Sequence, residues 1–230
     1  MREVVLDTET TGFDPVAGDR LVEIGCLELM NHIPTGKNLQ LYLNPERDMP
    51  EAAFQIHGLS SEFLGDKPKF ADIVDKLLAF IGDAQLVIHN AEFDMKFINY
   101  ELERVGKISI PMARATDTVR MARLKFPGAP ASLDALCKRF NIDNSTRSLH
   151  GALLDAQLLA EVYIELLGGR QRGLTLDAEP ASRDLDFSGA SQRKNSNRPV
   201  RVARPHAPTA EELEAHGKFI QTLTDPIWLK

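Results

Sequence analysis

The 230-residue sequence has little cysteine and tryptophan, with only two cysteines and one tryptophan. Cys26 and Cys137 form no CxxC pair, which argues against a disulfide framework and a cysteine-rich zinc site. We expect both thiols to be buried and reduced. The sequence has no apolar run of 18 residues and no secretory leader, so it predicts neither a membrane span nor export. The cytoplasm is therefore the expected location.

A surplus of basic residues is also absent. The net charge is -6 and the isoelectric point is about 5.6, whereas proteins that bind nucleic acid through a basic groove are usually more basic. Acidic groups that hold metal ions present positive charge once they are loaded. Composition therefore neither supports nor excludes a nucleic-acid substrate.

Hydrophobic patterning predicts an α/β fold. Short apolar or alternating segments predict strands at 4–6, 21–29, 39–43 and 86–88. Helical spacing and capping residues predict helices at 50–56, 70–80, 93–105, 133–140 and 151–167. Strands come first and βα alternation follows, so we expect a mixed sheet, mostly parallel with one antiparallel strand, flanked by helices.

The composition changes after residue 169, which predicts three regions. We expect a domain at 1–170, a flexible linker at 171–208 and a tail at 209–230. Thr209 and two following acids favour a new helix, and Trp228 lies near the end of the chain. Because the tail is too short to form its own core, we predict that it docks on a partner.

Carboxylates follow the first predicted strand. Asp7 and Glu9 come directly after the apolar residues 4–6, and residues two apart on a strand point the same way. A solvated strand end or a helix cap explains such a pair as well. Held together, however, the two charges repel unless a cation lies between them.

Two later segments repeat this arrangement. Asp94 falls in the first turn of the predicted helix after strand 86–88, and His150 and Asp155 lie at the start of the helix 151–167. Taken alone, each residue has an ordinary role as a helix cap or an N-terminal charge. Together, the four carboxylates favour two hard cations, Mg²⁺ or Mn²⁺, of the kind that hydrolyse phosphodiesters, and a nearby histidine suits a general base.

Three segments, 7–12, 89–94 and 150–155, resemble the three motifs of the DEDDh exonuclease family. Segments 132–137 and 149–157 further resemble the proofreading (epsilon) subunits of bacterial DNA polymerase III. The resemblance implies a ribonuclease H-like sheet and removal of mismatched 3′-terminal nucleotides as 5′-monophosphates from a single-stranded DNA end. It also implies the role of each residue. His150 is the implied base, and the implied metal ligands are Asp7, Glu9, Asp94 and Asp155.

The resemblance also implies contacts with the substrate. His57 lies in a segment, 56–59, that resembles a family segment beside the terminal nucleotide. Other residues inside the matched motifs are implied substrate contacts through backbone, stacking or carboxylate groups. These are Asp7, Thr8, Glu9, Thr10, Gly12, Asn90, Phe93 and Asp155.

The linker and tail resemble those of proofreading subunits, whose tail docks on the polymerase (alpha) subunit. The segment 171–176 resembles a sliding-clamp-binding peptide, although it lacks the terminal aromatic residue of stronger versions. A small accessory subunit is a further partner to consider. The arginines from Arg193 to Arg204 suit an extended, solvated linker or contact with DNA.

Two alternative functions are compatible with these motifs. The first is a free-standing DEDDh exonuclease that acts on RNA ends or oligonucleotides, because the motifs do not read the 2′-hydroxyl. The second is an inactive scaffold that stabilises a polymerase. The docking tail disfavours the first alternative, and the complete set of acids and histidine disfavours the second.

Overall fold

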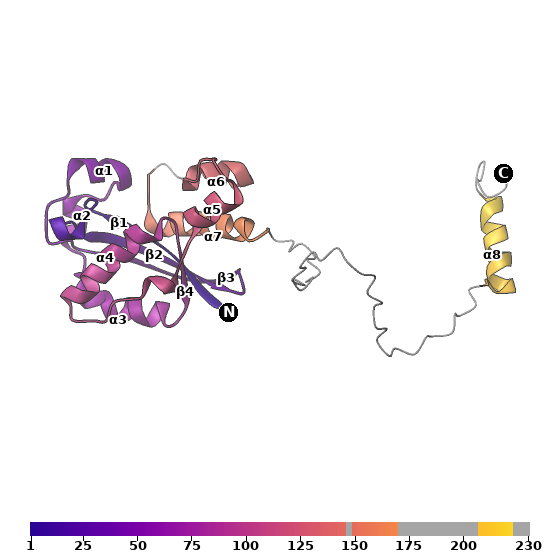
Figure 1. The fold of residues 1–230 in the computed structure, drawn as a ribbon, viewed down its shortest axis with the longest axis horizontal. Coiled ribbons are helices and arrows are strands. Elements are labelled where there is room, and N and C mark those ends of the chain that lie inside the picture. The colour runs from indigo at the N-terminus through magenta and orange to yellow at the C-terminus, as the bar shows by residue number, and fades with distance from the viewer. Residues whose placement is uncertain (146–148, 170–206, 223–230) are drawn as a thin grey trace, which may run out of the picture. The chain divides into compact units, whose positions relative to one another are not determined.

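The computed structural model describes residues 1–145, 149–169 and 207–222. The chain divides into two units, Met1–Leu176 and Asp177–Lys230. The first unit holds the sheet and its covering helices, and the described part of the second holds the helix α8 (Ala210–Gln221) (Figure 1).

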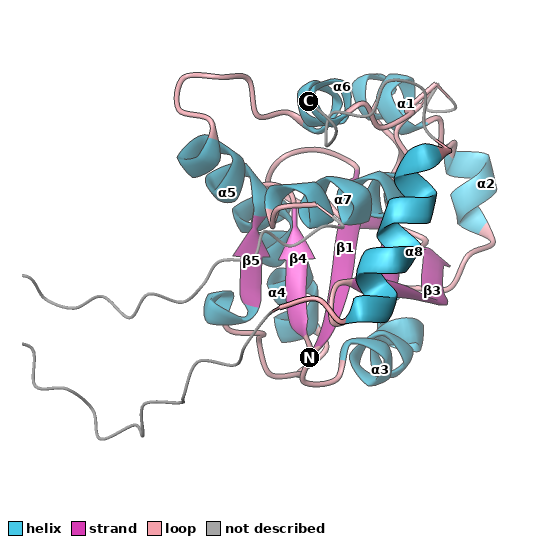
Figure 2. Ribbon diagram, turned by 90° about the vertical axis from the view of Figure 1, so that its right-hand side faces the viewer, coloured by secondary structure: helices cyan, strands magenta, loops and turns pink. Residues whose placement is uncertain are grey.

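The first unit is built on a five-stranded sheet of order β3-β2-β1-β4-β5. The strands are β1 (Arg2–Thr10), β2 (Leu21–Met30), β3 (Ile33–Tyr42), β4 (Gln85–Ile88) and β5 (Ala115–Asp117). β2 pairs antiparallel with both β1 and β3, whereas β4 pairs parallel with both β1 and β5. Four strands therefore run one way and β2 runs the other, which confirms the predicted mixed sheet (Figure 2).

Helices cover both faces of this sheet. The α-helices of the first unit are α1 (Glu51–His57), α2 (Ser61–Gly65), α3 (Phe70–Ile81), α4 (Ala91–Arg104), α5 (Thr118–Lys125), α6 (Leu133–Phe140) and α7 (Ala152–Leu166). Two short 3-10 helices are η1 (Pro15–Ala17) and η2 (Met112–Arg114).

The apolar core has one part on each face of the sheet. Val4 and Leu6 of β1 pack with α3 and α4, whereas Val5 packs on the opposite face with α6 and α7. This division follows from the alternation of strand side chains. Cys26 and Cys137 form no disulfide and are buried, one in each part, as expected, and burial raises the pKa of the Cys26 thiol to about 12.

Several helix starts carry the caps that the sequence predicts. The Ser132 hydroxyl accepts from Ala135 N at the start of α6, and Thr209 forms a capping box with Glu212 at the start of α8. Asn90 occupies the N-cap position of α4 with a left-handed backbone (φ 65°), but its side chain makes no capping hydrogen bond. α4 thus begins two residues before the predicted start at residue 93, and the Asn90 side chain does not cap it.

The sequence did not predict α2, β5, α5 or the two 3-10 helices η1 and η2. β3 also begins at Ile33, before the predicted start at residue 39, because its first six residues are exposed and carry no apolar alternation. Most of the predicted linker, the segment 171–176, the arginines from Arg193 to Arg204 and Trp228 lie outside the described residues.

No helix within the described ranges is both long enough and apolar enough to cross a membrane.

Candidate active site

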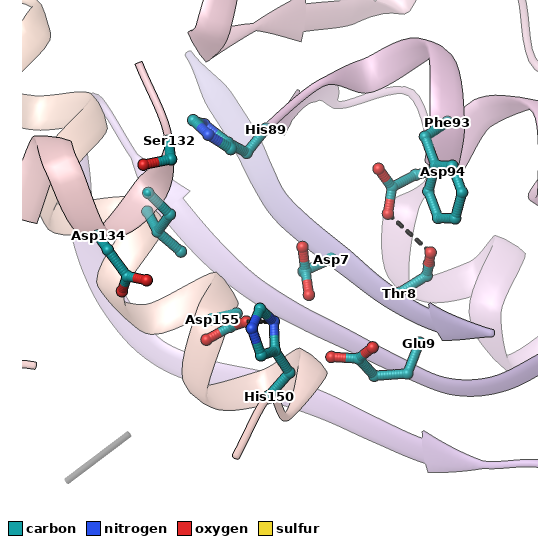
Figure 3. A pocket seen from close by; sticks show the side chains of 11 residues that line it. Asp7, Thr8, Glu9, His89, Phe93, Asp94, Ser132, Asp134, His150 and Asp155 are labelled. Atoms are coloured by element: carbon teal, nitrogen blue, oxygen red, sulfur yellow. Dashed lines mark hydrogen bonds and ion pairs between the residues drawn. The ribbon is translucent and has the colours of Figure 1, made fainter. Parts of the chain in front are cut away.

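A pocket of about 300 Å³ opens where β1 ends. It collects side chains from β1, the β4–α4 junction, the start of α6 and the start of α7 (Figure 3). Its lining residues are Asp7, Thr8, Glu9, His89, Phe93, Asp94, Ser132, Leu133, Asp134, His150 and Asp155. The structure thus brings the four predicted metal ligands and the predicted base into one pocket.

Three of these side chains are spaced to share a cation. Ligand atoms of Glu9, His150 and Asp155 all lie within 4.8 Å of one another. Asp7 projects from β1 into the middle of the same pocket (Figure 3). Carboxylate oxygens are the donors that hard divalent cations prefer, so this donor set fits Mg²⁺ or Mn²⁺.

Asp94 is buried at the edge of this acidic group. Its Oδ1 accepts a hydrogen bond of 2.7 Å from the Thr8 hydroxyl, and its exposure is 3%. Burial raises the pKa of Asp94 to about 7, although the Thr8 hydrogen bond acts in the opposite direction. A buried carboxylate of this kind is stabilised as an anion by a cation beside it, which again fits a metal site.

His150 lies at the mouth of the pocket. Its Nδ1 is 3.4 Å from Asp155 Oδ2, and its side chain is 48% exposed while that of Asp155 is 4% exposed. The backbone N–H of His150 donates to the Ile56 carbonyl at 3.0 Å, which ties this segment to the end of α1. The imidazole is therefore held beside an acid and in reach of solvent, as a group that exchanges protons must be.

The start of α7 is fixed against the sheet by β2. Gly25 pairs with Asp7, and a Cβ at Gly25 would lie 2.2 Å from the Ala152 carbonyl carbon. The Ala152 N–H donates to the buried carboxylate of Glu23 at 3.2 Å. The missing side chain at Gly25 thus lets the first turn of α7, with Asp155, approach the end of β1.

Four lining residues had not been assigned a site role from the sequence. They are His89, Ser132, Leu133 and Asp134. His89 Nδ1 lies 2.8 Å from the buried Thr118 hydroxyl, which orients the imidazole at the end of β4. The sequence signal that could have identified His89 as a site residue is its position directly after the predicted strand 86–88.

Some predicted substrate contacts lie away from this pocket. Gly12 is in the turn after β1, where a Cβ would lie 2.3 Å from Asp19 Oδ2. His57 is 5% exposed; its Nδ1 accepts from Leu59 N at 3.1 Å, and burial lowers its pKa. Asn90 lines a neighbouring pocket. Contact between these residues and a nucleotide stays a prediction, as it does for Thr10, whose hydroxyl donates to the Gly12 carbonyl.

Comparison with known proteins places the chain among nucleases. The exonuclease family matches residues 4–163. DNA polymerase III subunit epsilon of Rickettsia felis is 48% identical over 226 residues, covering 97% of each chain. The Escherichia coli subunit of the same name is 44% identical over 223 residues, covering 94% of this chain and 90% of the relative.

Solved structures share the fold at lower identity. The nuclease domain of 3'hExo, a DEDDh family member bound to rAMP, has a TM-score of 0.63 at 18% identity, with 74% of this chain and 94% of that chain covered. Exonuclease X in complex with 5′ overhanging duplex DNA has a TM-score of 0.56 at 23% identity, with 72% and 90% covered. By its matched residues and its full-length relatives, the chain belongs to the exonuclease family and, within it, to the DNA polymerase III epsilon subunits.

Proposed function

We propose that this protein is the proofreading 3′→5′ exonuclease subunit of a replicative DNA polymerase. It removes mismatched 3′-terminal nucleotides as 5′-monophosphates. The observation that carries this proposal is the convergence of Asp7, Glu9, Asp94, His150 and Asp155 in one pocket, from segments as far apart as β1 and α7.

The enzyme depends on divalent metal, in keeping with its family. We propose that two ions, Mg²⁺ or Mn²⁺, are held by the carboxylates of Asp7, Glu9, Asp94 and Asp155. The donor set supports this, because it is rich in oxygen and contains a buried acid with a raised pKa. When bound, such ions supply activation of a water and stabilisation of the charge on the departing oxygen.

His150 is proposed as the general base. Its imidazole takes a proton from the water whose oxygen attacks the terminal phosphodiester phosphorus. The bond from phosphorus to the 3′ oxygen of the preceding nucleotide breaks, and that oxygen then takes up a proton. Asp155, 3.4 Å from His150 Nδ1, orients the ring and stabilises the imidazolium that forms.

The pocket also offers a place for the terminal nucleotide. Phe93 lines it, and its ring is already held by Phe97 at a centroid distance of 5.1 Å. An aromatic face stacks on any base, which suits an enzyme that must remove all four. Preference for errors comes partly from the DNA, because a mismatched end separates from its template at a lower cost.

The relatives are named as subunits of DNA polymerase III, and we propose that this chain assembles with that polymerase through residues 209–230. α8 supports this, since Leu213 and Phe219 are 56% and 58% exposed and suit burial against a partner. A clamp contact through 171–176 and an accessory subunit are further proposals.

The test is hydrolysis of a 3′-labelled primer by the full chain. We expect labelled 5′-monophosphate to be released with Mg²⁺ or Mn²⁺ and not with a chelator, and faster from a mismatched than from a matched end. Asp7→Asn should abolish release. Asp75→Asn is the matched control, because that exposed acid of α3 pairs with Lys107 and does not line the pocket. Undiminished release by Asp7→Asn, or release in chelator, would contradict the proposal.

A further inference from the structure

A second pocket of about 460 Å³ adjoins the first. It lies between α5, the end of β4 and the segment before α6. Its lining residues are His89, Asn90, Val119, Arg123, Ala129, Pro130, Ala131 and Ser132. His89 and Ser132 line both pockets, so the two pockets lie side by side at these residues.

The two pockets differ in charge. Five acids line the first pocket, namely Asp7, Glu9, Asp94, Asp134 and Asp155. No acid lines the second pocket, and its one cationic side chain is Arg123, in the last turn of α5. The Arg123 side chain is exposed, and it makes no hydrogen bond or ion pair with another residue of the described ranges. A phosphate entering the second pocket thus meets a guanidinium and no competing carboxylate.

The shared residues indicate which part of a nucleic acid the second pocket faces. His89 and Ser132 lie on one side of Asp7, and Phe93 and Glu9 lie on the other (Figure 3). Hydrolysis of a terminal phosphodiester places the terminal nucleotide on one side of the acids and the preceding nucleotide on the other. With Phe93 beside the terminal base, the preceding nucleotide lies toward His89 and Ser132.

We propose that the second pocket holds the nucleotide that precedes the scissile bond, and that Arg123 binds its backbone phosphate. This inference rests on the proposed function and adds a substrate-binding residue to it. Guanidinium groups bind phosphate oxygens through charge-assisted, often bidentate hydrogen bonds. Val119, Ala131 and Pro130 give the same pocket an apolar wall for a sugar or a base. A contact with the phosphate does not depend on the identity of the base, which suits an enzyme that removes any nucleotide.

The test compares two substrates of the full-length Arg123→Ala variant. One is a single-stranded oligodeoxynucleotide, and the other is the 5′-p-nitrophenyl ester of thymidine monophosphate, in which nitrophenyl replaces the preceding nucleotide. For the oligonucleotide we expect KM to rise about tenfold with little change in kcat, because the variant loses one charge-assisted hydrogen bond in an exposed setting. The slope of log KM against log salt should fall by about 0.7, as for one phosphate contact on a single strand.

For the nitrophenyl ester we expect kcat and KM to match those of the unmodified protein, which also shows that the variant is folded. Arg120→Ala is the charge-matched control: it removes a cation of the same helix that lines neither pocket, and should leave both substrates unaffected.

Three outcomes would overturn the proposal: an unchanged KM for the oligonucleotide, an equal loss on the nitrophenyl ester, or an equal effect of Arg120→Ala. Weaker inhibition by nucleoside monophosphate without a change in KM would instead assign the pocket to the released product. If the unmodified protein hydrolyses neither substrate, the proposed function itself fails.

Discussion

Replacing Gly25 with alanine tests how the helix that carries Asp155 is positioned. The added Cβ would lie 2.2 Å from the Ala152 carbonyl carbon and 2.3 Å from Leu153 N, in the first turn of α7. Non-bonded carbon atoms prefer about 3.5–4.0 Å, so the helix start must retreat by more than about 1 Å. The φ angle at Gly25 is one that alanine adopts readily, so the effect is steric and not conformational.

We expect this substitution to lower the catalytic rate while the protein stays folded. A displacement of about 1 Å at a catalytic group costs on the order of 100-fold in rate, whereas overpacking costs about 1–3 kcal/mol of stability. We therefore expect kcat for release of labelled nucleotide to fall on the order of 100-fold, while circular dichroism shows a folded protein with a lowered Tm. Gly65→Ala is the control, since nothing lies within 4 Å of the Cβ it adds. Full activity in Gly25→Ala would refute this account of how α7 is placed.

Two further substitutions test the electrostatics of the pocket. Burial raises the pKa of Asp94 from 3.8 to about 7. When a chelator has removed the metal, ionisation of this buried group therefore lowers the free energy of unfolding as the pH rises through that range. Asp94→Asn should therefore raise Tm at pH 8 more than at pH 4 while abolishing hydrolysis; an equal change in Tm at both pH values would contradict it. His150→Ala should lower kcat by about 10²–10⁴-fold with little change in KM, and an unchanged kcat would remove it as the base.

The sheet was largely predictable because its central strands β1 and β4 contain short apolar runs. The residues 4–6 and 86–88 are buried, and they lie in β1 and β4 as expected. β5 escaped prediction because its three residues, Ala115–Asp117, are only half-buried and carry no apolar pattern. α5 had a readable signal in Asp117, whose carboxylate accepts from Val119 N and Arg120 N at the helix start.

Asp7, Glu9, Asp94 and Asp155 were readable from the sequence because each follows a short apolar run or lies in the first turn of a helix. The contacts that hold these residues together could not be read from the sequence. The carboxylate of Glu23 and the N–H of Ala152 are 129 positions apart, and no local pattern pairs them. Gly25 lies inside a largely apolar strand, where sequence alone does not show which backbone approaches it. The burial of His57 is likewise a tertiary property that its His-Gly segment does not reveal.

The proposed catalysis requires that acids distant in the chain hold a pair of divalent cations. Anomalous diffraction from crystals of the full chain soaked in Mn²⁺ tests it most directly. We expect two peaks about 3.5–4 Å apart inside the pocket, both bordered by Asp7, with Glu9 and Asp155 on one side and Asp94 on the other. The absence of any peak there at saturating Mn²⁺, or peaks confined to other surface acids, would contradict the account.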